Sequence, residues 1–428
     1  RKMKDSGIEW IGEIPEGWEI VPVRSCFDEV RTKNTDGQEQ NALQFKSGNI
    51  ISKTNFNASM DDYVADTITN YTVVLPDTVM INGLNLNYDF KSLRVALVKE
   101  KGVITSAYLA IFPDRKKISP QYATYLFKGY ETKMAFHNMG AGIRKTLGYK
   151  EFKNQPLLLP SEKEQNKISA YLDSKCSHID IMLSKIRSSI EEYKKLKQAV
   201  ITQAVTKGVR GEREMKDSGV EWIGEIPKEW VIQKIKSISS RINVGVVIRP
   251  SEYFDENGTV PFLRGINVKE YLISSDNMVY INESSNRILS KSQVHTDDIL
   301  IVRDGSIGTS CVVPAEFDGA NVVSMVIATP SISCDSRFIC YSLNSDVGKT
   351  QFTLTKIGSA LTHTSVSAVS DIIVAVPSCA EQKEIADYLD AKCVEIDGLI
   401  AKKEQLVKEL ESYKKSLIYE VVTGKREV

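Results

Sequence analysis

The chain has little that would mark a membrane, secreted or metal-bound protein. Its seven cysteines are scattered with no CxxC pair, so the sequence predicts neither a disulfide framework nor a zinc site. The longest apolar runs, such as residues 322–328, are far shorter than the ~20 residues of a membrane span. No basic segment followed by an apolar one opens the chain, so we expect no secretory signal and a reducing, cytoplasmic location.

Specific catalytic motifs are also missing. The four histidines lack metal-ligand spacing, and no NPPY-like or FxGxG string of an adenine methyltransferase occurs. Asp77, Asp89 and Lys91 match a nuclease pattern of two carboxylates and a lysine. A second string, from Asp114 to Lys133, matches equally well, so the pattern is unspecific. We therefore predict no catalytic residue, no metal ligand and no cofactor in this chain.

The net charge gives no sign of a nucleic-acid binder, because Lys+Arg and Asp+Glu both number 55. The charge is unevenly distributed, however. Residues 21–160 hold 18 basic and 13 acidic side chains, whereas residues 233–377 hold 12 and 14. If DNA is bound, local patches must supply the phosphate contacts.

An internal repeat organises the chain. MKDSGIEWIGEIPEGWEI from Met3 recurs as MKDSGVEWIGEIPKEWVI from Met215, and EQNKISAYLDSKCSHID from Glu164 recurs as EQKEIADYLDAKCVEID from Glu381. Matches of this length indicate a duplication. We predict a head followed by a helical region, twice. The boundaries are 1–160, 161–208, 209–377 and 378–428.

Two variable segments, 21–160 and 233–377, lie between the repeated blocks and share a plan. FKSGNI parallels LRGINV, DTVMIN from Asp77 parallels DILIVR from Asp298, and GAGIRKT parallels GSALTHT. Short apolar or alternating runs separated by Gly, Asn and Asp turns predict strands, with helices near 120–136 and 335–352. The fold class expected is α+β, with two globular heads built on mixed, largely antiparallel sheets.

The blocks after the variable segments have heptad patterns, which predict two long helices that pair as an antiparallel coiled coil. Lys403 interrupts the second pattern where Ile186 would align. Such pairing implies an internal pseudo-two-fold axis. The predicted seam residues are Ile179, Leu183, Ile186, Ile190, Ile396, Ile400, Val407 and Leu410.

Two heads on paired helices predict a molecular ruler. A helix over 180–206 would be roughly 40 Å long at 1.5 Å per residue. Helical DNA readers place their half-sites about 34–36 Å apart, so such a rod suits a split DNA site. The architecture alone favours the alternative, a duplicated coiled-coil scaffold that only organises partner proteins.

The repeated blocks carry a resemblance to a known family. KDSGIEWIGEIPEGWE, SEKEQNKISAYLD, CAEQKEIADYLD and the ending LIYEVVTGK resemble the DNA specificity subunits of type I restriction-modification systems. INGLNLNYDFKSLRVALV from Ile81 and VRDGSIG from Val302 look like target-recognition-domain sequence. The resemblance covers nearly the whole chain in the family's order. The two heads differ at most polar positions, as expected if they read different half-sites.

The resemblance implies a non-enzymatic subunit that binds double-stranded DNA at a bipartite site. Each head would read one half, and the helices would fix the gap between them. The helices and repeated segments would dock methyltransferase (modification) subunits, which use S-adenosylmethionine, and motor subunits, which use ATP and Mg.

Candidate DNA contacts follow from chemistry, because Arg, Lys, Asn and Gln can make paired contacts to base edges and Ser and Thr can assist. Turns rich in these residues on a rigid sheet are plausible readers, although solvated or backbone-capping roles are an alternative for each. The candidates are Lys46, Asn82, Asn85, Asn87, Arg144, Lys145, Thr146, Arg264, Arg303, Ser306, Thr362, His363 and Thr364.

Four tryptophans, Trp10, Trp18, Trp222 and Trp230, lie in the repeated segments outside the variable heads. Base stacking is one possible role. We favour packing against the helices or a partner subunit, because the repeated segments are the parts the two copies share.

Overall fold

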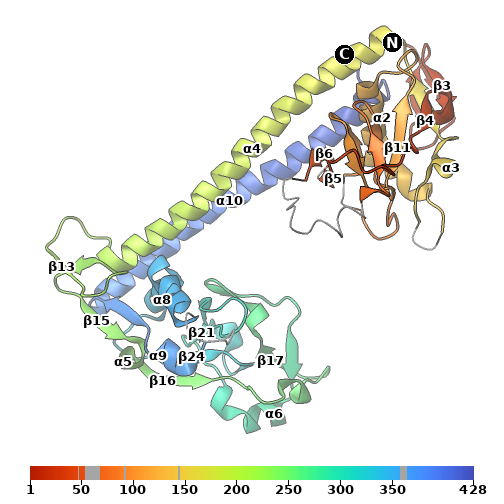
Figure 1. The fold of residues 1–428 in the computed structure, drawn as a ribbon. Helices are drawn as coiled ribbons and strands as arrows, with labels where there is room; N and C mark the ends of the chain where they lie inside the picture. Colours follow the sequence, from red (N-terminus) through yellow and green to blue (C-terminus); the bar gives the residue numbers. More distant parts are fainter. Residues whose placement is uncertain (47, 54–67, 91–92, 143–144, 357–363) are drawn as a thin grey trace. The chain divides into compact units, whose positions relative to one another are not determined.

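The computed structural model describes residues 1–46, 48–53, 68–90, 93–142, 145–356 and 364–428 (Figure 1). Internal contacts divide the chain into two compact units, Arg1–Arg187 with Glu404–Val428, and Ser188–Lys403. Each unit contains a head, the first part of the long helix that follows this head and the last part of the other long helix. Both heads combine helices with largely antiparallel sheets, which confirms the predicted α+β class.

The first head is built on a four-stranded antiparallel sheet. Alternate strand residues face opposite sides, as the pleat requires. Val79 and Ile81 belong to the core under the helix α2 (Pro120–Thr132), whereas Met80 belongs to a second core on the other face. In spatial order the strands are β4 (Phe27–Glu29), β11 (Leu109–Pro113), β8 (Val79–Ile81) and β9 (Val95–Leu97).

Antiparallel strand pairs and short helices complete the first unit. The pairs are β1 (Met3–Asp5) with β2 (Glu13–Pro15), β3 (Glu19–Pro22) with β12 (Pro156–Leu159), β5 (Leu43–Lys46) with β6 (Asn49–Ser52), and β7 (Thr72–Val74) with β10 (Gly102–Ile104). The short helices are η1 (Val23–Ser25), η3 (Ala135–Asn138) and α3 (Tyr149–Phe152). Through β3 and β12 the two ends of the variable segment meet.

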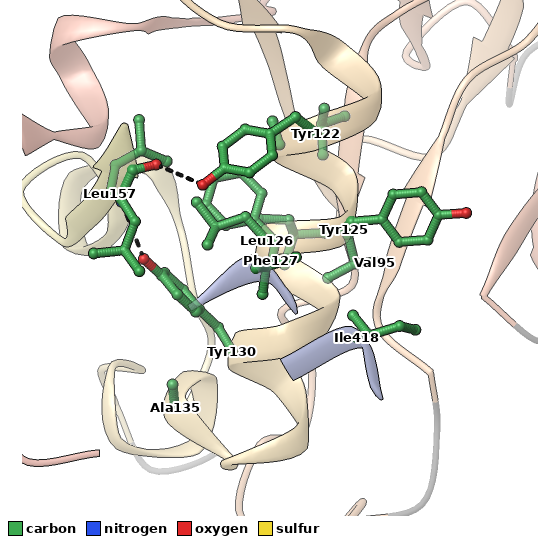
Figure 2. Close-up of a cluster of buried hydrophobic side chains, with 14 of the residues drawn as sticks. Val95, Tyr122, Tyr125, Leu126, Phe127, Tyr130, Ala135, Leu157 and Ile418 are labelled. Atoms are coloured by element: carbon green, nitrogen blue, oxygen red, sulfur yellow. Dashed lines mark hydrogen bonds between the residues drawn. The ribbon is translucent and has the colours of Figure 1, made fainter. Parts of the chain in front are cut away.

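The core beneath α2 also holds the strand that closes the variable segment (Figure 2). The Tyr122 hydroxyl donates to the Leu158 carbonyl across 3.0 Å, and the Leu158 N–H donates to the Tyr130 hydroxyl across 3.3 Å. Ile418, near the end of the chain, packs in this same core. The last turns of the second long helix are therefore part of the first unit.

The second head repeats this plan. Its four-stranded antiparallel sheet has the order β16 (Ser239–Val244), β24 (Val326–Pro330), β21 (Ile299–Ile301) and β22 (Ser310–Val312). A mixed sheet has the order β20 (Val279–Ile281), β17 (Val260–Leu263) and β23 (Asn321–Val322), with β17 and β23 parallel. The remaining pairs are β13 (Met215–Asp217) with β14 (Glu225–Pro227), β15 (Val231–Lys234) with β25 (Ile373–Val376), and β18 (Val268–Lys269) with β19 (Leu272–Ile273).

Two helices of the second head, α7 (Ser336–Asn344) and α8 (Asp346–Lys356), match the predicted stretch near 335–352. The head also has three shorter helices, α5 (Ile235–Ile238), α6 (Glu283–Ile288) and α9 (Val366–Ser370). The described residues of this head also form four 3-10 turns: η4 (Pro250–Tyr253), η5 (Gly265–Asn267), η6 (Ser290–Ser292) and η7 (Ala315–Phe317).

The two long helices are confirmed and exceed the expected length. The helix α4 (Glu162–Lys207) has 46 residues and α10 (Cys379–Val422) has 44. A glycine in the left-handed region follows each helix: Gly208 at φ +76° directly after α4, and Gly424 at φ +70° two residues after the end of α10. Glycine adopts this conformation without a Cβ penalty, so it suits a helix end.

Within each unit the two helices run antiparallel. In the first, Asp180 pairs with Lys414 and Arg187 with Glu411, so numbers rise on one helix and fall on the other. In the second, Lys197 pairs with Asp397 across 2.6 Å. Among the described residues, no helix has the length and apolar content needed to cross a membrane.

The predicted seam residues lie along this contact with unequal burial. Ile179, Leu183, Ile190 and Ile396 are buried. The half-buried members are Ile186, Ile400, Val407 and Leu410. Where two helices meet without a head beside them, one side of each seam residue faces solvent. The Lys403 ammonium at the imperfect position lies 5.4 Å from the Tyr193 ring, which gives the charge a favourable partner.

Candidate nucleic-acid interface

Two polar turns of the first head are joined by hydrogen bonds. The Asn loop, residues 82–89, follows β8 and holds Asn82, Asn85 and Asn87. The Leu86 N–H donates to the Lys145 carbonyl across 3.2 Å, and the Leu147 N–H donates to the Gly83 carbonyl across 2.9 Å. A Cβ on Gly83 would lie 2.5 Å from the Leu147 carbonyl oxygen, so glycine permits this close approach. The structure thus brings the predicted asparagines beside Lys145 and Thr146.

The side chains of this pair of turns differ in exposure. Asn85 is exposed and has φ +53°, a conformation that asparagine tolerates. Lys145 and Thr146 are exposed, while Asn82 and Asn87 are half-buried. The Asn82 side chain accepts from the Leu84 N–H across 3.2 Å, so part of its hydrogen-bonding capacity shapes the loop.

Lys46 lies close to this region. It is exposed at the end of β5, opposite Asn49 of β6. A Cβ on Gly48 in the same hairpin would lie 3.0 Å from the Leu93 Cβ, next to the residue Arg94 that contacts the Asn loop. The hairpin therefore packs against Leu93, the neighbour of the residue that holds the Asn loop.

The second head has a matching construction. The Arg303 loop, residues 302–309, follows β21. The Arg303 Nε donates to the Thr364 carbonyl across 2.9 Å, and the Thr364 N–H donates back to the Arg303 carbonyl across 3.1 Å. Ser306 is exposed, but Thr364 is only 4% exposed and does not present its hydroxyl to solvent.

Arg264 takes the place that Lys46 has in the first head. A Cβ on Gly265 would lie 3.4 Å from Val302, so this turn reaches the start of the Arg303 loop. The half-buried Arg264 guanidinium donates to the Asn277 carbonyl. Part of the hydrogen-bonding capacity of the Arg264 guanidinium is therefore used to hold the backbone at Asn277.

Three candidates, Arg144, Thr362 and His363, lie outside the described residues. Among the described residues no group of three or more His, Cys, Asp or Glu side chains could hold a metal ion.

One alignment made from sequence was wrong by a residue. It paired Asp77 with Asp298, but the structure pairs Asp77 with Asp297. Both have positive φ, at +75° and +69°, and their N–H groups donate to the equivalent carbonyls of Val98 and Val313. The second copy has two adjacent aspartates, Asp297 and Asp298, so the sequence alone is compatible with either alignment. Asn82 consequently corresponds to Val302, so the polar residues of the two loops occupy different positions.

Arg94 and Glu131 form part of the first head's site and were missed from sequence. The Arg94 guanidinium is buried and contacts the Asn loop, and the Arg94 N–H donates to the Glu131 carboxylate. Burial raises the pKa of the Glu131 carboxyl to about 7, against the opposing hydrogen bond and charge of Arg94. The available signal was a lone arginine inside the apolar run SLRVALV.

The repeated segments form an Arg-Trp-Glu cluster in each unit. In the first, the Trp18 indole N–H donates to Glu164 across 2.9 Å, and Arg1 pairs with Glu164 and lies over the Trp18 ring. In the second, Arg213 pairs with Glu381 and lies over the ring of Trp230. Extending the repeat two residues upstream would have aligned Arg1 with Arg213.

The packing role favoured for the tryptophans holds for Trp18 and Trp230, which are 1% and 0% exposed. Trp10 packs edge-on against Tyr130 at 4.6 Å between ring centroids. Trp222 is 38% exposed.

Comparisons with known proteins agree with this architecture. Residues 227–410 match the family model of the type I restriction modification DNA specificity domain. The type I restriction enzyme MjaVIII specificity subunit of Methanocaldococcus jannaschii is 24% identical over 418 residues, 96% of this chain and 93% of that one. A protein of the same organism assigned as the MjaX specificity subunit is 25% identical over 427 residues, 97% and 95% of the two chains.

Solved structures share the fold. A chain from a study of complex assembly and conformational transition of the type I R-M system has a TM-score of 0.71 at 14% identity, covering 96% of this chain and 98% of that one. The HsdS subunit from Thermoanaerobacter tengcongensis has a TM-score of 0.53 at 15% identity, covering 99% and 100%.

Two copies of one α+β unit, each with a pair of polar loops and a long helix, define a duplicated two-headed protein. The family match and the relatives that span its length go further. Residues 227–410 match the DNA specificity domain of type I restriction-modification systems, and over nearly its whole length the chain is similar to specificity subunits of such systems. Its relatives are specificity subunits, in keeping with the expectation of a non-enzymatic subunit.

Proposed function

We propose that this chain is the sequence-reading subunit of a type I restriction-modification complex. Each head reads one half of a bipartite site in double-stranded DNA, and the paired helices set the gap between the halves. The chain supplies recognition only. Partner subunits supply the chemistry, with S-adenosylmethionine for methylation and with ATP and Mg for translocation and cleavage.

One observation carries this proposal. In the first head the Asn loop, which follows β8, is hydrogen-bonded to the turn at Lys145, before β12. In the second head the Arg303 loop, which follows β21, is hydrogen-bonded to the turn at Thr364, before β25. The construction is the same, but the side chains it presents are different: asparagines and lysine in one head, arginine and serine in the other. A shared scaffold that presents unlike donor and acceptor sets suits two readers of unlike half-sites.

The repeated segments support a docking role for partners. They include the helices, which expose large apolar side chains at equivalent positions of the two copies, such as Leu196 and Tyr413. We propose that modification subunits and motor subunits assemble on these shared parts, because two similar surfaces can hold two copies of one partner. An interaction scaffold that never contacts DNA is the alternative that the experiment must exclude.

The test measures DNA binding by the full chain together with its modification subunit. Methylated adenines are mapped in a host that carries both subunits, and duplexes with the mapped site are then used in gel shifts at two salt concentrations. Sequence-selective binding that weakens with salt supports the proposal. Binding that is indifferent to sequence, or absent in the complex, overturns it.

Variants of exposed residues assign the heads. Asn85→Gly keeps the left-handed backbone and removes only the amide, so selectivity should fall at one half of the site by about 1–3 kcal/mol per lost base contact. Lys145→Ala should weaken binding and reduce the salt slope. Lys116→Ala, an exposed lysine elsewhere in the same head, is the matched control and should change neither.

A further inference from the structure

A buried arginine holds the Asn loop from beneath. Arg94 is 1% exposed and stands just before β9, opposite the point where the chain leaves β8. Its Nη1 donates to the carbonyls of Asn82 and Leu84, both across 2.9 Å. Its Nη2 donates to the Asp89 carbonyl. One guanidinium thus reaches the beginning and the end of the loop.

The arrangement divides the loop into an inner and an outer side. Leu86 is fully buried, and the carbonyls of residues 82, 84 and 89 point at Arg94. Asn85 is exposed, and Tyr88 is 71% exposed. The side chains available to a ligand are therefore presented by a backbone whose shape depends on the arginine.

The second head has no equivalent among its described residues. The Asn82 N–H donates to the Arg94 carbonyl across 2.8 Å, and the matching bond joins Val302 to Thr309 across 2.9 Å, so Thr309 takes the place of Arg94. Thirteen residues separate β8 from β9, but only eight separate β21 from β22. The longer connection needs an internal anchor that the shorter one does not.

We propose that Arg94 is a positioning residue for DNA recognition by the first head, acting by fixing the backbone of the Asn loop. Its planar donor fork can serve several carbonyls at once. Lysine cannot replace it, because an ammonium is a point charge without the fork's geometry. Two contacts of neighbouring groups assist: the Arg94 N–H donates to Glu131, and the His137 Nε2 lies 3.1 Å from the Asp89 carbonyl oxygen.

This inference rests on the proposed function, and its test is arranged so that the two can fail separately. The full chain is produced with its modification subunit in a host without other adenine methylation, and methylated adenines are mapped for wild type, Arg94→Lys and Arg94→Met. A wild type that methylates no defined bipartite motif overturns the proposed function. The inference about Arg94 is judged only against a defined wild-type motif.

The expected result is confined to one half of the motif. Both variants should lose discrimination roughly 10-fold at that half, the size of one lost base contact, while the other half keeps its sequence. Hydrogen exchange of the amides of 83–89 should accelerate in the Lys variant, which keeps the charge and is the milder change. An unchanged motif in a folded Arg94→Lys variant overturns the inference.

Two controls separate positioning from simple loss of stability. Ile111→Val removes one methylene from the core of the same head and should lower stability without changing the motif. Arg115→Lys changes an exposed arginine of that head, which pairs with Asp77, and should have no effect. If Ile111→Val relaxes the same half-site as Arg94→Lys, or if Arg94→Lys weakens both halves equally, the inference fails.

Discussion

The Trp18 indole N–H donates to the Glu164 carboxylate across 2.9 Å, which joins residues 146 positions apart and ties the repeated N-terminal segment to the start of α4. Glu164 also pairs with Arg1, and in the second copy Glu381 keeps the equivalent pair with Arg213. Among the described residues the Trp230 Nε1 has no hydrogen-bond partner. The duplication has thus kept the three residue types but not the bond.

This difference gives a first prediction. Trp18→Phe loses a hydrogen bond to a charged group together with packing, whereas Trp230→Phe loses packing alone. We expect Trp18→Phe to destabilise its own unit by about 1–2 kcal/mol more than Trp230→Phe destabilises the second. Hydrogen exchange in increasing denaturant measures each unit separately. Equal losses would show that the Trp18 bond adds nothing.

Glu131 gives a prediction about pH. Its carboxyl binds a proton more tightly in the folded chain, with a pKa of about 7 against an ordinary value of 4.5. The folded state therefore holds the extra proton between these values, and the Glu131 contribution to stability falls as pH rises from about 4.5 to 7. Glu131→Gln removes this dependence and keeps an acceptor for the Arg94 N–H. Its melting temperature relative to wild type should rise between pH 5 and 8.

Asp114 is the matched control, because its pKa is shifted the other way. The Lys116 N–H and then Lys117 lower the pKa of the Asp114 carboxyl below 3.8. Its contribution is complete above its unfolded pKa and is lost only as pH falls through the lower, folded one. The offset between Asp114→Asn and wild type should therefore stay flat from pH 5 to 8. A flat offset for Glu131→Gln as well would refute the assignment.

The sequence was sufficient for features that local patterns determine. The repeat follows from the matched blocks, and the long helices follow from heptad periodicity over neighbouring residues. Two polar turns selected from sequence as separate candidates, Asn82 to Asn87 and the turn with Lys145, are joined by hydrogen bonds in the structure. Their counterparts in the second head meet through Arg303 and Thr364.

Contacts that depend on loop shape could not be predicted. Arg94 reads as one cation in an apolar strand, and only the folded loop shows that three carbonyls converge on it. The alignment of Asp77 with Asp297 was missed because either of two adjacent aspartates fits the sequence pattern. Seam burial varied because a heptad gives the facing side of a helix but not whether a head covers it, as Leu183 and Ile400 illustrate.

Gln165 gives a prediction about the junction between head and helix. It is 1% exposed, its Oε1 accepts from the Ser119 N–H across 2.8 Å, and its Nε2 donates to the carbonyls of Lys117 and Pro160. Gln165→Leu leaves these groups buried without partners, so we expect a loss of about 2–4 kcal/mol in the first unit. Denaturant titration followed by hydrogen exchange measures it.

The second copy supplies the control for that loss. Gln382 accepts from the Asp335 N–H across 2.9 Å and donates to the Pro377 carbonyl across 3.0 Å, so Gln382→Leu should cause a similar loss in the second unit only. Gln121→Leu, whose side chain makes one exposed bond to Asp173, should cost less than about 1 kcal/mol. A loss in Gln165→Leu no larger than that in Gln121→Leu would contradict the prediction.

The helix seam allows packing and charge to be compared at neighbouring positions. Leu183 is 5% exposed in the core of the first unit, so Leu183→Ala should cost about 2–4 kcal/mol through lost burial and a residual cavity. Asp180, three residues earlier, pairs with Lys414 across 2.6 Å but is 58% exposed, so Asp180→Asn should cost less than about 1 kcal/mol. Added salt should shrink the Asp180 effect, because screening weakens an exposed pair, and should leave the Leu183 effect unchanged. Hydrogen exchange on α4, measured during unfolding of the full chain at low and high salt, tests both predictions. If Asp180→Asn lost as much stability as Leu183→Ala, charge and not the apolar seam would hold the helices together in this unit.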